Sequence, residues 1–441
     1  MSSVVLAHGV GGRQDLPIPF GLAVAGAAVA LLVSFLVLGL AWRDPRYRGD
    51  RSGRPLPRRL ATVADASWLR WVLRVAGLVA TGYVLLALLF GPDLATNPTA
   101  GVVYVLLWVG IVPASLLLGP VWKLVNPVRT VHLLACRAMR VDPLDGLARL
   151  PSGLGSWPGA VGLFAFVWLE LVAPDQATLP VLRLWFAAMA AVLLLGAFVF
   201  GSRWLDAADP FEVYSGLVAR LSWVGRRADG VLVARRPLEN LDSTPVRPGL
   251  TAVVVVLLGS TAYDSAKHAP WWARWAQELP LPTVLTGTLG LSLWIGAVAV
   301  TYVLATRAAG LLTGTPGRGL PDLFAHSVVP IVVGYVVAHY VTLLVLEGQN
   351  TLVLLSDPLG TGADWLGTGD RLVDRSLANQ PSLVANLQVS AVVLGHVLGI
   401  VSAHDRSVRV FPRRSAVVGQ LPLLAVMVAY TVGGLLLLFA G

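Results

Sequence analysis

Long runs of apolar residues recur along the whole chain. Ten of them are long enough to cross the hydrocarbon core of a bilayer as helices, which takes about 20 residues for a thickness of roughly 30 Å. They occupy residues 20–41, 71–90, 101–119, 157–173, 181–201, 250–263, 281–306, 323–346, 387–403 and 417–440. The pattern predicts an all-α fold: a polytopic integral membrane bundle of about ten transmembrane helices, with residues 1–441 as a single membrane domain.

Composition supports this prediction and limits the classes of binding partner that we expect. Hydrophobic residues make up 56% of the chain and charged residues only 13%, which excludes a string of soluble domains. The net charge of +9 comes from arginines between the apolar runs. No basic patch interleaved with aromatic residues is present, so no nucleic-acid partner is expected. The lipid bilayer is the expected partner, and the sequence leaves protein partners open.

The distribution of basic residues predicts the orientation. The connections after the first, third, fifth, seventh and ninth runs hold 25 Lys and Arg, whereas the opposite side holds five. Basic residues stay in the cytoplasm, so both termini are expected outside. The first run lacks a basic leader and a small-residue cleavage site, so we expect an anchor. The abundance of Arg, Ala, Gly and Val is typical of a GC-rich bacterial genome, which favours the bacterial cytoplasmic membrane.

The same orientation assigns the connections. Residues 1–19 are an expected outward segment, 347–386 an outward loop, and 120–156 and 202–247 cytoplasmic amphipathic connections. Within the last two, Pro127 and Pro210 follow an Asn and an Asp, a pair that caps a new helix with proline at its first position. The 83-residue spacing allows a weak internal repeat, as in transporters. We favour the simpler interpretation of two interfacial helices with the same capping chemistry.

Polar residues inside the apolar runs are costly and therefore indicate function. Helical rise and alternating span direction place them in two layers. The outer layer holds Tyr263, Asp264 and His339, with Tyr340 one residue further on. His396 is expected near the middle of the membrane.

The inner layer contains His326 and His404 with Asp322 and Asp405 beside them. Asp322 and His326 are four residues apart and share a helical face, so they can form a pair or hold one ion. His339 is about 20 Å further along an ideal helix, unless Pro330 breaks it. The spacing D-x3-H-x12-H resembles a ligand motif of the copper membrane monooxygenases, but it covers only eighteen residues and is a weak motif.

Metal binding depends on histidines and carboxylates, because Cys136 is the only cysteine. The candidate ligands of a divalent metal ion, copper or zinc, are His8, Asp322, His326, His339, His396 and His404. Haem between paired histidines is a weaker alternative, and interhelical hydrogen bonds are a third. His8 lies in a glycine-rich segment that can fold back to donate a ligand.

Several segments together resemble a group of actinobacterial polytopic membrane proteins labelled fenitrothion hydrolase-like. The segments are LAHGVGGRQDLPIPF, DPFEVYSGLVARL, GSTAYDS, FAHSVVPIVVGYVVAHY and GHVLGIVSAHDR. The resemblance covers most of the chain. It implies hydrolysis of an organophosphorus triester and names no catalytic residue.

Three functions follow as hypotheses. The first is a metal-dependent, membrane-embedded hydrolase of a small hydrophobic substrate, with Asp264, Tyr263 and Tyr340 as catalytic candidates. The second is a proton-coupled transporter or metal permease, since intramembrane carboxylates and imidazoles suit a proton path. The third is a structural or assembly protein whose histidines join helices.

Overall fold

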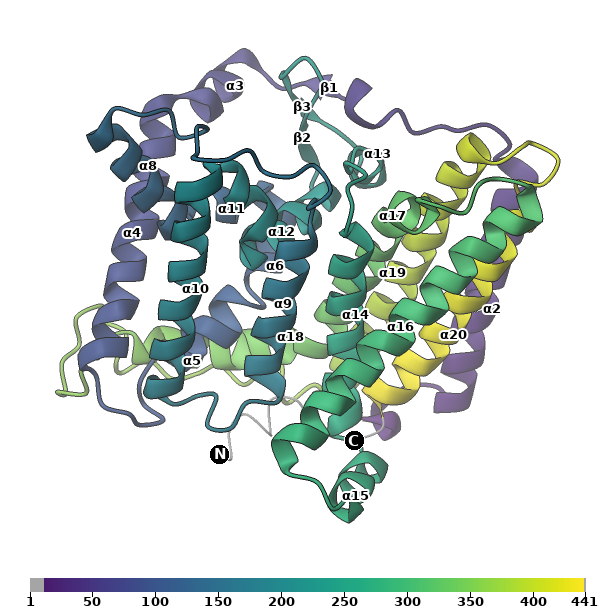
Figure 1. Ribbon diagram of the computed structural model, residues 1–441. Coiled ribbons are helices and arrows are strands. Elements are labelled where there is room, and N and C mark those ends of the chain that lie inside the picture. Colours follow the sequence, from purple (N-terminus) through teal and green to yellow (C-terminus); the bar gives the residue numbers. More distant parts are fainter. Residues whose placement is uncertain (1–11, 440–441) are drawn as a thin grey trace. The chain divides into compact units, whose positions relative to one another are not determined.

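A computed structural model describes residues 12–439 of the chain (Figure 1). The described residues are helical apart from loops and three short strands, which confirms the all-α prediction. Contacts divide the chain into two compact units. Unit 1 comprises Met1–Gly49, Leu241–Thr342 and Arg375–Gly441, and unit 2 comprises Asp50–Asn240 and Leu343–Asp374. The expected single membrane domain stays a prediction.

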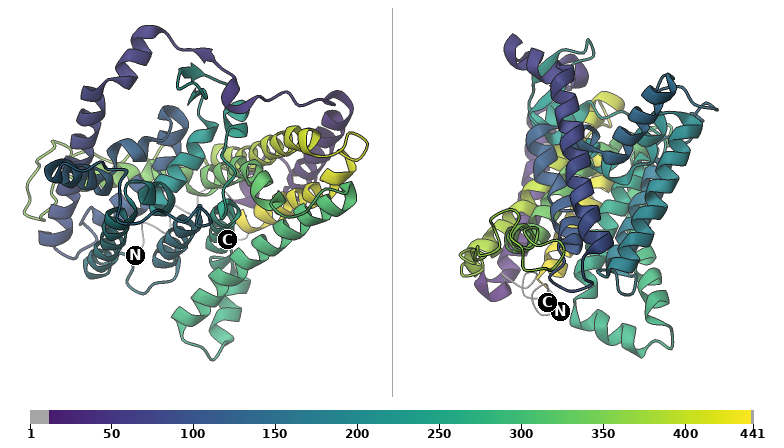
Figure 2. Two further views of the ribbon diagram at one scale, coloured as in Figure 1. Left: turned by 45° about the horizontal axis from the view of Figure 1, so that its top comes forward. Right: turned by 90° about the vertical axis from the view of Figure 1, so that its left-hand side faces the viewer.

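Unit 1 is a bundle of long apolar helices. Its elements are η1 (Arg13–Asp15), α2 (Phe20–Ala41), α14 (Leu250–Lys267), α15 (Pro270–Glu278), α16 (Thr283–Thr313), α17 (Leu320–Phe324), η5 (Ala325–Val328), the start of α18 (Val329–Leu354), α19 (Pro381–Val410), η6 (Val418–Gln420) and α20 (Leu421–Leu438). Helix α14 packs along α16, and α20 lies against α16, α19 and α2 (Figure 1). The short helix α15 sits at the turn between α14 and α16 (Figure 2).

Unit 2 holds the remaining elements, apart from residues 49 and 241–242 at the ends of two of them, which belong to unit 1. They are η2 (Gly49–Arg51), β1 (Arg54–Pro55), α3 (Arg58–Asp65), α4 (Ser67–Phe90), α5 (Thr99–Gly101), the π-helical turn η3 (Val102–Leu107), α6 (Ile111–Leu118), α7 (Val121–Val125), α8 (Pro127–Met139), α9 (Trp157–Leu171), α10 (Leu179–Phe200), α11 (Arg203–Ala208), α12 (Pro210–Val218), η4 (Ala219–Leu221), β2 (Val224–Arg226), β3 (Leu232–Ala234), α13 (Pro237–Asp242) and the rest of α18. The strands form an antiparallel sheet in the order β1-β3-β2, in which Arg54 pairs with Ala234 and Gly225 with Val233.

Seven helices within residues 12–439 are long and apolar enough to cross a membrane, or eight if one bent pair counts as a single span. They are Phe20–Ala41, Ser67–Phe90, Leu179–Phe200, Thr283–Thr313, Leu320–Leu354, Pro381–Val410 and Val418–Leu438, and the bent pair is Thr99–Leu107 with Ile111–Leu118. They are consistent with a multi-pass membrane protein. The count of ten stays a prediction.

The expected spans differ from these helices in informative ways. The expected span 157–173 forms α9, which has only 15 residues. The expected span 101–119 is bent by 43° at its break, and Pro113 in the first turn of α6 cannot continue a hydrogen-bond ladder from the preceding turn. The expected loop 347–386 is shorter, since α18 continues to Leu354 and α19 begins at Pro381.

Helices α18 and α19 approach each other closely at glycines. A Cβ on Gly334 would lie 2.4 Å from the carbonyl oxygen of Ala391, and one on Gly395 would lie 2.6 Å from that of Pro330. Small residues allow such close approach between membrane helices. The buried side chains of Tyr335 and Ala338 pack in the same core, with α2, α19 and α20.

The two Asx-Pro pairs cap helices as predicted. The side chain of Asn126 accepts a hydrogen bond from the backbone N–H of Arg129, and Asp209 accepts from those of Phe211 and Glu212. Pro127 and Pro210 occupy the first position of α8 and α12. However, the two helices are not free amphipathic segments, because Asn126 and Asp209 are buried and joined by a hydrogen bond of 2.8 Å.

Candidate functional site

The best-formed polar site of unit 1 surrounds Asp264 in the last turn of α14. Its side chain is only 5% exposed. The Oδ2 atom lies 3.0 Å from Nε2 of His339 and accepts a hydrogen bond of 2.7 Å from the hydroxyl of Tyr340. Both partners come from α18. Asp264 and His339, which were expected at a similar height, are therefore in direct contact.

Ser265 extends this contact into a chain of hydrogen bonds. Its Oγ lies 3.3 Å from Nδ1 of His339 and 2.8 Å from the hydroxyl oxygen of Tyr335. Because a carboxylate only accepts, the Nε2–H of His339 donates to Asp264, and Nδ1 is then the acceptor that faces Ser265 in a neutral imidazole. A hydroxyl, an imidazole and a carboxylate are thus connected in series.

A lysine completes the surroundings of the carboxylate. The Nζ of Lys267 lies 3.2 Å from Oδ1 of Asp264, so each oxygen faces its own set of partners. The Lys267 side chain is 23% exposed, much more than the carboxylate. His268 contributes differently, since its Nδ1 donates to the backbone oxygen of Asp264 at 2.7 Å. The negative charge of Asp264 is therefore compensated within the helix bundle.

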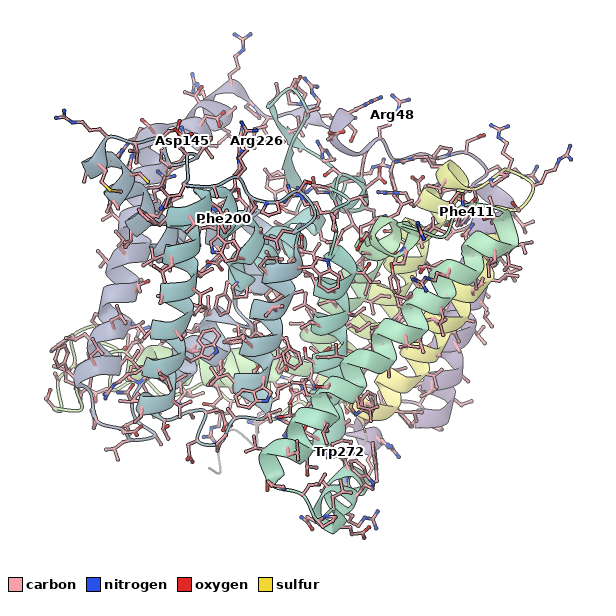
Figure 3. All side chains as sticks on the ribbon, in the orientation of Figure 1. Arg48, Asp145, Phe200, Arg226, Trp272 and Phe411 are labelled. Atoms are coloured by element: carbon pink, nitrogen blue, oxygen red, sulfur yellow. The ribbon has the colours of Figure 1, made fainter. Side chains whose placement is uncertain are left out.

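Tyr263 does not join this site in the expected way. Its ring packs against Trp272 of α15, with 5.6 Å between ring centroids and an interplanar angle of 84°. Figure 3 labels Trp272 on this short helix and Phe411 at the opposite end of the same bundle. Neighbouring side chains on a helix point about 100° apart, so Tyr263 and Asp264 face different surroundings. Its proposed role as a hydrogen-bond donor stays a prediction.

The inner-layer residues have other partners. Asp322 accepts from the backbone N–H and hydroxyl of Thr251, at 2.8 and 2.7 Å. His326 lies in the turn η5 and its Nδ1 contacts the Leu323 carbonyl at 3.1 Å. The break of the helix precedes Pro330. Asp322 and His326 are therefore not paired with each other, because the turn removes their common helical face.

His404 is held by two other segments. Its Nδ1 lies 2.9 Å from Oε1 of Gln420, and its Nε2 lies 2.8 Å from the carbonyl oxygen of Trp42. Its neighbour Asp405 contacts the Trp42 indole, the backbone N–H of Arg46 and the Arg409 guanidinium. These bonds join α19 to the segment that follows α2. His404 and Asp405 therefore stabilise the packing of these two segments.

His396 is the exception among the histidines. Its Nδ1 donates to the carbonyl oxygen of Val392 at 2.8 Å, and its Nε2 is buried without a hydrogen-bond partner among the described residues. Within residues 12–439 no three or more His, Cys, Asp or Glu side chains are grouped to hold a metal ion. His8 lies outside the described residues. Binding of a metal ion or of haem stays a prediction.

Ser265, Tyr335 and Lys267 are the site residues that the sequence analysis did not single out. Two of them carry a usable signal, since Tyr335 is four residues before His339 and Lys267 three after Asp264, which are helical neighbours. Ser265 carries none, because serine is common in helices of membrane proteins and usually bonds to its own backbone.

No protein-family model matches the chain, and no curated protein or solved structure has significant similarity to it. The resemblance to the fenitrothion hydrolase-like group stays a prediction. The fold defines a helical protein with the features of multi-pass membrane proteins, and its site is a buried chain of serine, histidine and aspartate.

Proposed function

We propose that the protein is a membrane-embedded hydrolase of small hydrophobic esters, with Ser265 as nucleophile, His339 as general base and Asp264 as the group that orients the imidazole. One observation carries the proposal. The Oγ of Ser265, the two ring nitrogens of His339 and the carboxylate of Asp264 are joined in series, at 3.3 and 3.0 Å. This arrangement of roles recurs on unrelated folds and is defined by geometry.

The proposed chemistry proceeds in two steps. The Ser265 oxygen attacks a carbonyl or phosphoryl centre while its proton passes to Nδ1 of His339, and the bond to the leaving group breaks as that group takes up the proton. Water then attacks the covalent ester and gives a proton to His339, and the bond to Ser265 breaks as the imidazolium returns that proton to the Ser265 oxygen. Asp264 stabilises the imidazolium that forms in both steps.

Tyr335 and Lys267 supply the remaining electrostatics. The Tyr335 hydroxyl lies 2.8 Å from the attacking oxygen, within reach of the negative charge that develops on the substrate. Lys267 and Tyr340 hold Asp264 ionised by opposite charge and hydrogen bonding. The surrounding helices are apolar, which favours a hydrophobic ester or an organophosphorus triester that enters from the lipid.

Labelling with a fluorophosphonate probe tests the proposal. Purified protein in detergent is incubated with the probe, digested and analysed by mass spectrometry. We expect covalent phosphonylation of Ser265 with loss of fluoride, and no labelling of Ser265→Ala. Ser260→Ala is the matched control, because Ser260 is buried on the same helix and its Oγ donates to the Leu257 carbonyl of its own helix. Labelling that is absent from the wild type, or equal in both variants, excludes the proposal.

A chelator separates this mechanism from the metal-assisted one. Hydrolysis of a p-nitrophenyl ester or of a p-nitrophenyl phosphotriester is followed with and without EDTA. A serine mechanism retains its rate, whereas a mechanism through a metal ion, copper or zinc, loses it.

A specific observation favours a second function, proton-coupled transport. The hydrogen bonds continue from Tyr335 through Ser265, His339 and Asp264 to Lys267, which is a path along which a proton can move inside a bundle. If the protein is a transporter, the fluorophosphonate probe does not label the wild type. Proteoliposomes on a solid-supported membrane then show currents on addition of a solute, and Asp264→Asn abolishes them.

The proposed setting of either function is the bacterial cytoplasmic membrane, with ten spans and both termini outside. The asymmetry of basic residues supports this orientation.

A further inference from the structure

Unit 2 contains a second cluster of ionisable residues, which the hydrolase chemistry does not use. It consists of Lys123, Arg129, Asp206, Asp209 and Glu212, on α7, α8, α11, the N-cap of α12 and α12. The side chains of Arg129 and Glu212 are only 8% and 6% exposed, and Asp209 is also buried. Charged groups at such burial require compensation.

Two chain segments with the same local plan build the cluster. In each, an apolar helix ends at a glycine with positive φ, Gly119 or Gly201, and a short helix follows. An Asx residue then caps a helix that begins with Pro127 or Pro210. The two prolines are 83 residues apart, which gives the spacing noted in the sequence a structural counterpart.

Equivalent positions of the two segments bind each other. The ammonium group of Lys123 pairs with Asp206, 83 residues later. The amide of Asn126 donates to Oδ2 of Asp209 at 2.8 Å, again 83 residues later.

The third pair, Arg129 and Glu212, is also separated by 83 residues and forms a bidentate ion pair. Arg129 donates through Nε and Nη2 to the two carboxylate oxygens of Glu212, at 2.9 and 2.7 Å. Nη2 also reaches Asp206 at 2.9 Å. The segments are therefore complementary in charge, one basic and one acidic.

The charges do not cancel. Three carboxylates face two cations, so the cluster carries one excess negative charge if every group is ionised. Asp209 contributes this excess, because the hydrogen bonds to its carboxylate come from the neutral Asn126 amide and the backbone of Phe211 and Glu212. An uncompensated buried charge is costly, and protonation of one carboxyl group removes it.

Further charged residues lie on the elements around these five side chains. The start of α9 meets α12 through Gly159 and Gly162, and Glu170 is eight residues further along. Arg220 follows Glu212 by eight residues, roughly 12 Å at helical rise. Other charged residues on the elements packed here are Arg70 and Arg74 on α4, His132 and Arg137 on α8, Arg183 on α10, and the exposed Arg203 on α11.

Charged side chains on α4 and α8 contact residues outside the cluster. Arg74 and Arg137 stack on the ring of Trp71, at 5.0 and 4.2 Å from its centroid. His132 contacts the carbonyl oxygen of Pro143 at 3.4 Å. None of these side chains bonds to Asp209 in the described structure.

We propose that the five side chains form a proton-binding site, in which one proton, held by either Glu212 or Asp209, neutralises the cluster. Burial raises the pKa of Glu212 to about 7, against the opposing effect of Arg129 and Lys123. Burial also raises the pKa of Asp209. Attraction to Lys123 and Arg129 lowers the pKa of Asp206 despite its partial burial. The proton therefore belongs to the two more deeply buried acids.

Infrared difference spectroscopy between pH 5 and pH 9 tests the site on the full-length protein in detergent. We expect the carbonyl stretch of one protonated carboxyl group to disappear near pH 7. The charge count also predicts the result for two variants. Glu212→Gln and Asp206→Asn each leave two carboxylates and two cations, so the cluster is neutral without a bound proton. Both variants are expected to lose this signal, although Asp206 itself does not carry the proton.

Lys123→Met provides a test on a residue whose side chain is 47% exposed, so little packing is lost. Removal of one cation leaves an excess of two negative charges, and the carboxyl signal is expected to grow and to persist to higher pH. Asp229→Asn is the matched control, because Asp229 is an exposed acid of the same unit that pairs with Arg227, and it leaves the signal unchanged. A wild type without such a signal, or a signal unaltered in all three cluster variants, overturns the proposal.

Discussion

The Nε2 atom of His339 lies 3.0 Å from Oδ2 of Asp264, although 75 residues separate them in the chain. The contact joins α14 to α18 inside unit 1 and leaves the second ring nitrogen directed at Ser265. A base that is positioned by a carboxylate and faces a hydroxyl is one arrangement that activates an oxygen nucleophile.

Replacement of His339 tests its role as a base. We expect His339→Ala to reduce the rate of Ser265 phosphonylation by roughly 10²–10⁴-fold, because general bases contribute about that factor. His268→Ala is the control with a much smaller expected effect, since the His268 side chain is 56% exposed and its Nδ1 bonds to the backbone oxygen of Asp264, 3.9 Å from Oδ1 of the carboxylate. Equal rates in wild type and His339→Ala contradict the assignment. Circular dichroism verifies that the variants remain helical.

Stability is expected to fall as the pH rises towards neutrality. The pKa of Glu212 is raised in the folded state to about 7 from an ordinary value of 4.5. The folded state then holds a proton that the unfolded state has released, so the stabilisation is complete below pH 4.5 and is lost as the pH rises through about 7. The free energy of unfolding decreases by about 3 kcal/mol over this range. Unfolding by denaturant at a series of pH values measures it.

The same experiment has a direct control. Glu212→Gln cannot titrate, so its unfolding free energy is expected to change much less between pH 4.5 and pH 7. An equal slope in both proteins assigns the pH dependence to other groups.

A glycine contact in unit 2 provides a packing test. A Cβ on Gly77 would lie 2.0 Å from the carbonyl oxygen of Val125, which joins α4 to α7. We expect Gly77→Ala to destabilise the protein by roughly 1–3 kcal/mol, because the two backbones must separate. Gly82→Ala on the same helix meets no atom within 4 Å and is expected to leave stability unchanged or slightly higher. Denaturant unfolding in detergent compares the two variants.

The orientation can be tested with single cysteines. Cys136 is the only cysteine, so Cys136→Ser supplies a background without thiols. In intact cells, we expect Arg274→Cys to react with a membrane-impermeant maleimide and Arg413→Cys to react only after lysis. Both side chains lie in exposed positions. The reverse pattern shows that the termini face the cytoplasm.

The sequence predicts those parts of the structure that depend on local chemistry. The expected span 20–41 coincides with α2, because its apolar run has clear polar limits. The caps at Asn126 and Asp209 are also correct, since an Asx-Pro pair acts on its own backbone. Helical rise alone places His339 at the height of Asp264.

Contacts between distant segments could not be predicted in the same way. The expected pair of Asp322 and His326 is absent because the turn η5 and the bond to Thr251 change the direction of both side chains. Complementarity of the two Asx-Pro segments was also missed, since periodicity does not show which helix faces pack together. Ser265 becomes a candidate only when α18 places His339 beside it.

The division of the chain also has a consequence for biosynthesis. Helix α2 ends at Ala41, but its partner α19 begins only at Pro381. At about 5–20 residues per second, the ribosome needs roughly 20–70 s to deliver that partner. During this time α2 must wait in the bilayer, while most of unit 2 is already complete. Insertases and lipid are therefore expected to shield α2 until α18, α19 and α20 have been synthesised.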